Sequence, residues 1–171
     1  MSVVIIILRL VHIGLGVFWA GAMLFVVIFL EPSVREAGPD GAKVMQGIMR
    51  RRYLNWMPLF AGLTIFSGLA LLHRASVGFN GVWIASPVGL GYTTGGVAAI
   101  LAFIIGVFVM RRSVLKAAGL NAALQKTPDD PSRDATMAVI QALRHRARIA
   151  GRWVAGLLSI AVVTMAVARY L

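Results

Sequence analysis

Cysteine is absent from the sequence, and acidic residues are scarce. The chain of 171 residues contains no cysteine, and its six Asp and Glu stand against 17 Lys and Arg. The lack of cysteine excludes disulfides, thiolate metal sites and iron–sulfur clusters, which leaves His, Met and carboxylates as metal ligands. The motifs HExxH and GxSxG, a Walker loop and a Ser/Lys pair are also missing. The sequence therefore offers no hydrolase or nucleotide-driven machine and predicts no particular enzymatic activity.

Long apolar runs dominate what remains. Hydrophobic residues make up 59% of the chain and charged residues 13%, and the mean hydropathy is +0.83. Soluble domains are usually about 45–50% apolar and about 25% charged. Four runs approach the roughly 20 apolar residues that cross a bilayer, at residues 3–30, 56–73, 89–110 and 151–170. These runs predict one all-α domain over residues 1–171, a four-helix transmembrane bundle whose first run is retained and not cleaved as a signal.

The basic residues flank the apolar runs. Five Lys and Arg follow the first run, nine follow the third, and Arg74 alone follows the second. Because cytoplasmic loops carry an excess of Lys and Arg, this distribution predicts a multi-pass protein of the inner (cytoplasmic) membrane with both termini outside. The net charge of +11 is thereby explained by topology and lipid contact, and no nucleic-acid partner is expected.

Two features are predicted on the cytoplasmic side. Residues 40–53 resemble an interfacial amphipathic helix, with Asp40 at its start as a cap and basic Arg50, Arg51 and Arg52 at its end. Its expected apolar face consists of Val44, Met45, Ile48 and Met49. Helix-forming sequence on both sides of "TPDDPSR", residues 127–133, predicts that the third and fourth spans extend as an antiparallel hairpin. In this hairpin Val114, Leu115, Ala118 and Leu124 would face Met137, Ile140 and Leu143.

Polar residues inside the first span suggest a functional site. Arg9, His12, Gly16, Trp19 and Met23 are spaced three or four apart, which places them on one face of a helix. No span contains Asp or Glu, so a carboxylate proton relay is not expected. An ionisable residue in a membrane span is a functional candidate by default, although His12 also fits a packing role between helices.

The same face has the parts that a tetrapyrrole requires. His12 offers an imidazole nitrogen for a metal, Gly16 and Trp19 offer a smooth wall, and Arg9 offers a cation for a propionate. His73, at the end of the second span, is predicted on the same outer side, so a metal held by both His12 and His73 is geometrically conceivable. A solvated surface histidine is the alternative interpretation of His73.

The stretch "LRLVHIGLGVFWAGAMLFVVIFLEPSVR", residues 8–35, has an early histidine, a Trp-x-Gly motif at Trp19 and Gly21, and a proline–arginine exit. With the four-span layout, this pattern resembles the CopD-like copper-resistance membrane proteins and the HemJ-type protoporphyrinogen oxidases of bacteria. The resemblance implies that His12 corresponds to the first-span histidine that those families associate with b-type heme or with metal handling.

Two functions are consistent with the sequence. In the first, the protein binds heme b, or a related tetrapyrrole, near the outer side and serves electron transfer or heme-linked redox chemistry. In the second, it is a cofactor-free accessory or structural subunit, whose glycine-rich faces dock other membrane subunits or further copies of itself. The lipid bilayer is a partner in both.

Overall fold

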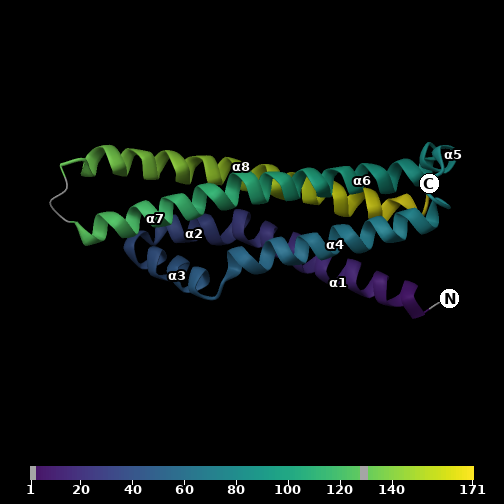
Figure 1. The fold of residues 1–171 in the computed structure, drawn as a ribbon, viewed down its shortest axis with the longest axis horizontal. Helices are drawn as coiled ribbons and strands as arrows, with labels where there is room; N and C mark the ends of the chain where they lie inside the picture. The colour runs from purple at the N-terminus through teal and green to yellow at the C-terminus, as the bar shows by residue number, and fades with distance from the viewer. Residues whose placement is uncertain (1–2, 128–130) are drawn as a thin grey trace.

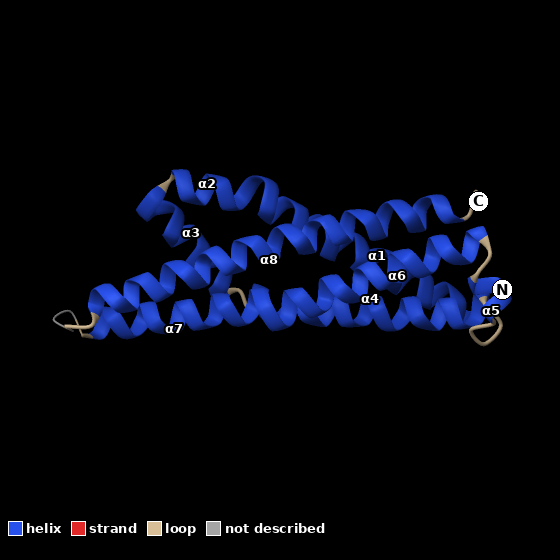
Figure 2. Cartoon of the chain, turned by 90° about the horizontal axis from the view of Figure 1, so that it is seen from above, coloured by secondary structure: helices blue, strands red, loops and turns tan. Residues whose placement is uncertain are grey.

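The structure, a computed structural model, describes residues 3–127 and 131–171, and within these residues it contains helices and no strand (Figures 1 and 2). Two of the helical segments, η1 and η2, are π-helical. In chain order the elements are α1 (Val3–Phe25), η1 (Val26–Leu30), α2 (Glu31–Glu36), α3 (Gly38–Arg50), α4 (Tyr53–Ala75), α5 (Gly81–Ile84), α6 (Pro87–Ile104), η2 (Ile105–Arg111), α7 (Arg112–Lys126) and α8 (Arg133–Ala168).

Within residues 3–127 and 131–171, four continuous helical stretches are long and apolar enough to cross a membrane. They are Val3–Glu36, formed by α1, η1 and α2; Tyr53–Ala75, formed by α4; Pro87–Lys126, formed by α6, η2 and α7; and Arg133–Ala168, formed by α8. Apart from residues 169–170, the four predicted spans lie within these stretches. The prediction of an all-helical chain with four apolar helices is confirmed, and it supports a membrane protein.

The bundle consists of two closely packed pairs, α1 with α4 and α6 with α8. No pair of Cα atoms from the described residues of α1 and α6 lies within 8 Å. The second pair is close because of two glycines of α6. A Cβ atom at Gly91 would lie 2.7 Å from Ala168 Cβ, and one at Gly95 would lie 2.7 Å from Met165 Cγ. This is the close helix packing that two small residues four positions apart allow.

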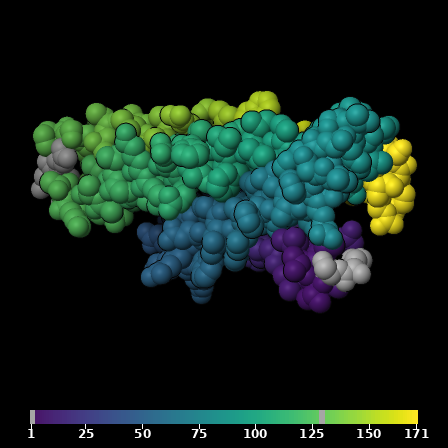
Figure 3. Space-filling model, turned by 45° about the vertical axis from the view of Figure 1, so that its right-hand side comes forward, coloured from purple at the N-terminus to yellow at the C-terminus, as the bar shows by residue number. Residues whose placement is uncertain are grey.

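A shared core joins the two pairs. It is formed by Trp19, Ala20 and Met23 of α1, Met57 and Ala61 of α4, Ala102 of α6, and Val154 and Leu158 of α8. The first half of α1 lies outside this core. Its apolar side chains are largely exposed, with Val3 70% and Leu10 68% accessible, and it stands out from the rest of the molecule in Figure 3. Such a surface is the kind that lipid tails cover.

Helix α3 covers most of the predicted segment, residues 40–53, but it begins earlier and ends at Arg50. It starts at Gly38, whose backbone has a φ of +56°, after the cap residue Ala37, which makes no side-chain capping bond. Asp40 therefore does not cap the helix. It lies in the first turn, where Lys43 Nζ donates to Asp40 Oδ1 over 2.7 Å. The capping prediction is wrong because glycine takes the left-handed conformation readily and lets the chain turn two residues sooner.

Helix α7 runs beside the first part of α8 (Figures 1 and 2). Their contact is a cluster of Ala117, Leu124 and Ile140, with Leu120 and Leu143 packed against it. Leu124, Ile140 and Leu143, which the sequence predicts to face each other, all belong to this cluster. Leu115, 44% exposed, and Met137, 37% exposed, point away from the cluster, so the predicted face of α7 is wrong by part of a turn. Of the predicted connection, residues 128–130 lie outside the described residues.

Candidate functional site

His12 lies where α1 contacts α4. Its Nδ1 atom is 2.8 Å from the backbone oxygen of Thr64, and its ring occupies the space over Gly68. A Cβ atom at Gly68 would lie 2.6 Å from His12 Cε1. Glycine at position 68 therefore makes room for the imidazole, and α4 presents a backbone acceptor one turn earlier.

This contact defines the state of the imidazole ring. A carbonyl oxygen only accepts hydrogen bonds, so Nδ1 carries the proton and donates it to Thr64. In neutral histidine the lone pair then resides on Nε2. Nε2 has no hydrogen-bond partner among the described residues. In those residues, every fully buried side-chain nitrogen or oxygen of a non-exposed residue has a partner, so Nε2 is not one of the fully buried atoms. The free nitrogen of His12 is therefore not fully enclosed by the described residues, although it lies inside an apolar stretch.

The other members of the predicted stripe share the face of His12, as expected. Gly16 approaches α4, because a Cβ atom there would lie 3.3 Å from Thr64 Cγ2. Trp19 is 5% exposed and belongs to the shared core. Both residues are thus occupied in packing α1 against its neighbours. Arg9 is exposed, and among the described residues it has no hydrogen-bond or ion-pair partner.

His73 lies on a different side of α4. It is five positions after Gly68, which on an α-helix means a rotation of about 140° and a rise of about 7.5 Å. Its exposed ring packs edge-on against Phe79, with 5.0 Å between the ring centroids. Within the described residues, no group of three or more His, Cys, Asp or Glu is placed to hold a metal ion. The structure therefore gives no contact that joins His73 to His12.

A second polar site was not predicted from the sequence. At the end of η2, Arg111 Nε donates to the backbone oxygen of Leu54 over 2.9 Å, and Arg111 Nη2 donates to Asn55 Oδ1 over 3.1 Å. Pro58 explains the first bond. Proline has no N–H, so it leaves the carbonyl four residues earlier, that of Leu54, without its helical partner. The arginine supplies the donor that an apolar environment requires.

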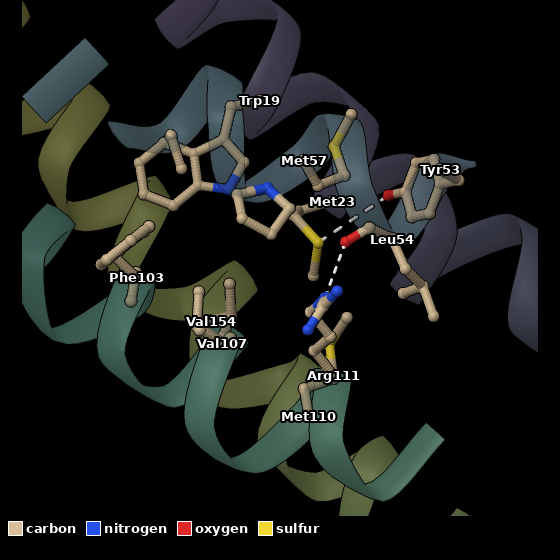
Figure 4. A pocket seen from close by; sticks show the side chains of 14 residues that line it. Trp19, Met23, Tyr53, Leu54, Met57, Phe103, Val107, Met110, Arg111 and Val154 are labelled. Atoms are coloured by element: carbon tan, nitrogen blue, oxygen red, sulfur yellow. Dashed lines mark hydrogen bonds between the residues drawn. The ribbon is translucent and has the colours of Figure 1, made fainter. Parts of the chain in front are cut away.

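Figure 4 shows Arg111 at the edge of a crevice that also involves Trp19, Met23 and Tyr53, whose hydroxyl lies 3.9 Å from the Met23 sulfur. The crevice has a volume of about 30 Å³. Ligand pockets usually measure about 300–1,000 Å³, whereas about 10–15 Å³ of such volume is enough to hold a water. This crevice is therefore a packing defect of water size and not a site for an organic ligand.

The fold and the polar contacts define a class: an all-helical protein with four helices suited to crossing a membrane and a histidine tied to a neighbouring helix by its backbone. Comparison of the chain with family models, curated proteins and solved structures gives no match.

Proposed function

We propose that the protein binds a b-type heme, or a related tetrapyrrole, through Nε2 of His12. One observation carries the proposal: Nδ1 of His12 is held by the Thr64 carbonyl over 2.8 Å, and Nε2 stays free in an apolar helix. Metal-bound histidines almost always donate their second ring nitrogen to a carbonyl, carboxylate or water, which orients the ring. A histidine prepared in this way is suited to a metal ligand.

The fit of the surrounding residues is partial. Arg9 lies one turn before His12 on the same face and is unpaired among the described residues, so it would hold a propionate. Gly16 and Trp19 support the site indirectly, because they fix α1 against α4 and the core. His73 remains a proposed second ligand, although the structure gives no contact between His73 and His12. A bound heme would supply a one-electron centre for electron transfer or related redox chemistry.

An accessory subunit without a cofactor is the second candidate. The contacts of Gly16 with Thr64 and of His12 with Gly68 make this stripe part of the α1–α4 packing. Nε2 of His12 would then accept a hydrogen bond from a helix of another subunit or of a second copy. Both candidates give the free nitrogen a partner, which a polar group in hydrocarbon requires.

We further propose that the protein is a multi-pass protein of the inner membrane with both termini outside. Helix α3 would lie in the cytoplasmic interface, and the α7–α8 hairpin would extend into the cytoplasm. The excess of Lys and Arg after the first and third spans supports this orientation, and Glu31 and Arg148, with 3.1 Å between their Oε1 and Nε atoms, tie α2 to α8 on that side.

The optical spectrum of the protein purified in mild detergent from heme-replete cells tests the first candidate. A Soret band and a reduced alpha band are expected. His12→Ala should abolish or greatly reduce the heme content while the protein remains inserted, and Arg9→Ala should weaken heme retention less. If the wild-type protein carries no tetrapyrrole absorbance, the heme proposal fails and His12 is a packing or subunit-contact residue.

Three further variants separate ligation from packing. His12→Asn keeps an amide N–H near the position of Nδ1, so it should preserve the contact with Thr64 and still lose the heme. His145→Ala removes an exposed histidine of α8 and should leave the heme content unchanged. His73→Ala decides the second ligand: loss of heme or a high-spin spectrum supports it, and an unchanged spectrum excludes it.

A further inference from the structure

An open apolar groove lies between α1, α3 and α4. It has a volume of about 360 Å³, and it is lined by Phe18 of α1, Ile48 of α3, Arg51 just after α3, and Trp56 and Phe60 of α4. The aromatic walls are ordered by their own contacts. Phe18 and Phe60 meet edge to face at a centroid distance of 5.2 Å, and Trp56 stacks on Phe60 at 5.6 Å. The groove is therefore a preformed apolar surface of ligand size.

Positive charge adjoins this groove, because Arg51 lines it and two further arginines flank Arg51 in the chain. Arg50, Arg51 and Arg52 are exposed where α3 ends and α4 begins, and none of them has an acidic partner. The ion pairs of the described residues join Lys43 to Asp40 and Arg148 to Glu31. Arg51 Nη1 makes a 3.3 Å bond to the backbone oxygen of Gly47, which uses one of its donors and leaves the others free.

Along the helix axis, the arginines and the groove follow the order of the headgroup and the acyl chain in a lipid molecule. The arginines precede the apolar helix α4, and Phe60 lies eight residues after Arg52, which is about 12 Å deeper along the helix. A phosphate at the arginines therefore leaves its acyl chain level with Trp56 and Phe60. Guanidinium groups bind phosphate in a bidentate manner, and three of them disfavour a headgroup that carries its own cation.

We propose that this groove is a binding site for one acidic phospholipid, with its phosphate held by Arg51 and its neighbours and an acyl chain lying against Phe18, Trp56 and Phe60. The site is independent of His12 and of heme. It distinguishes a specifically bound lipid from the general lipid layer, because it combines an ordered aromatic wall with uncompensated positive charge.

Tryptophan quenching tests the proposal in nanodiscs of zwitterionic lipid that contain a minor fraction of acidic phospholipid brominated on its acyl chains. Trp56 lines the groove and is 50% exposed, whereas Trp153 on α8 is 65% exposed and lies outside it. Acidic brominated lipid should quench the wild-type protein and Trp153→Phe beyond its bulk fraction. In Trp56→Phe this excess should disappear, because only the general lipid layer then reaches a tryptophan.

Charge variants test the role of the headgroup. Each Lys or Arg near an anionic surface contributes about 1 kcal/mol, so Arg51→Gln should lower the apparent affinity for the acidic lipid about fivefold. Arg144→Gln, an exposed arginine of α8, should leave it unchanged. Equal quenching by acidic and zwitterionic brominated lipid would overturn the proposal, and so would quenching of Trp56 no greater than the bulk fraction, as expected if a protein or a second copy covers the groove.

Discussion

The contact of His12 with Gly68 can be tested by adding a single methyl group. Gly68→Ala would place a Cβ atom 2.6 Å from His12 Cε1 and 3.0 Å from Nδ1. Both distances are too short, so either the ring or helix α1 must move. Overpacking of this kind costs about 1–3 kcal/mol, and alanine returns about 1 kcal/mol through its better helix propensity. The net loss of unfolding free energy should be about 0–2 kcal/mol.

A double-mutant cycle isolates the contact. In a His12→Ala background the ring is gone, so Gly68→Ala should keep only the gain in helix propensity and become stabilising by about 1 kcal/mol. The coupling energy between the two positions should therefore be about 1–3 kcal/mol. His12→Ala alone should cost little, because hydrogen bonds between membrane helices average about 0.6 kcal/mol.

The measurement is reversible unfolding in mixed micelles of a mild detergent and SDS, followed by circular dichroism. Gly62→Ala is the matched control on the same helix, because no atom lies within 4 Å of a Cβ at that position, and it should be neutral or stabilising in both backgrounds. A coupling energy below about 0.5 kcal/mol would be within the range of independent sites and would refute the packing of His12 over Gly68.

Two further predictions concern the bundle. Arg111→Leu should destabilise it by about 1–3 kcal/mol in the same unfolding assay, because the Leu54 carbonyl loses its donor. Pro58→Ala should recover part of this loss by restoring a helical N–H. An equal cost of Arg111→Leu with Pro58 and with Ala at position 58 would contradict this explanation. A cysteine introduced at Asn80 should react with a membrane-impermeant maleimide from outside intact cells, whereas one at Lys126 should react only after lysis, and the reverse pattern would invert the proposed topology.

The sequence predicts the four spans well because hydropathy reports directly on which residues tolerate lipid. Hydropathy carries no information about helical segments beyond the bilayer. The extension of α8 back to Arg133 is therefore predicted from the helix-forming sequence after residues 127–133 and not from hydropathy, and its first turns pack on α7. The face of α7 was partly wrong for the same reason: several alanines and leucines fit more than one helical stripe, and only the partner helix decides between them.

The sequence predicts which residues form the stripe of His12, Gly16 and Trp19, but it does not predict what the stripe contacts. Helical spacing correctly places these residues on one face, but the spacing contains no information about which helix covers that face. The partner, Gly68 with the Thr64 carbonyl, is more than 50 residues away in the chain. Pro58 could have signalled a free carbonyl at Leu54, whereas the identity of its donor, Arg111, depends on a contact between α4 and η2.

The length of α8 has a mechanical consequence. Its 36 residues form a continuous rod of about 54 Å, well beyond the hydrocarbon thickness of about 30 Å. The rod crosses the shared core at Val154, about 31 Å from one end and about 21 Å from the other. The shared core therefore divides the helix into two arms of unequal length. Both arms are held by packing: Ile140 is buried against α7, and Ala168 lies so close to α6 that a Cβ atom at Gly91 would be 2.7 Å from its own.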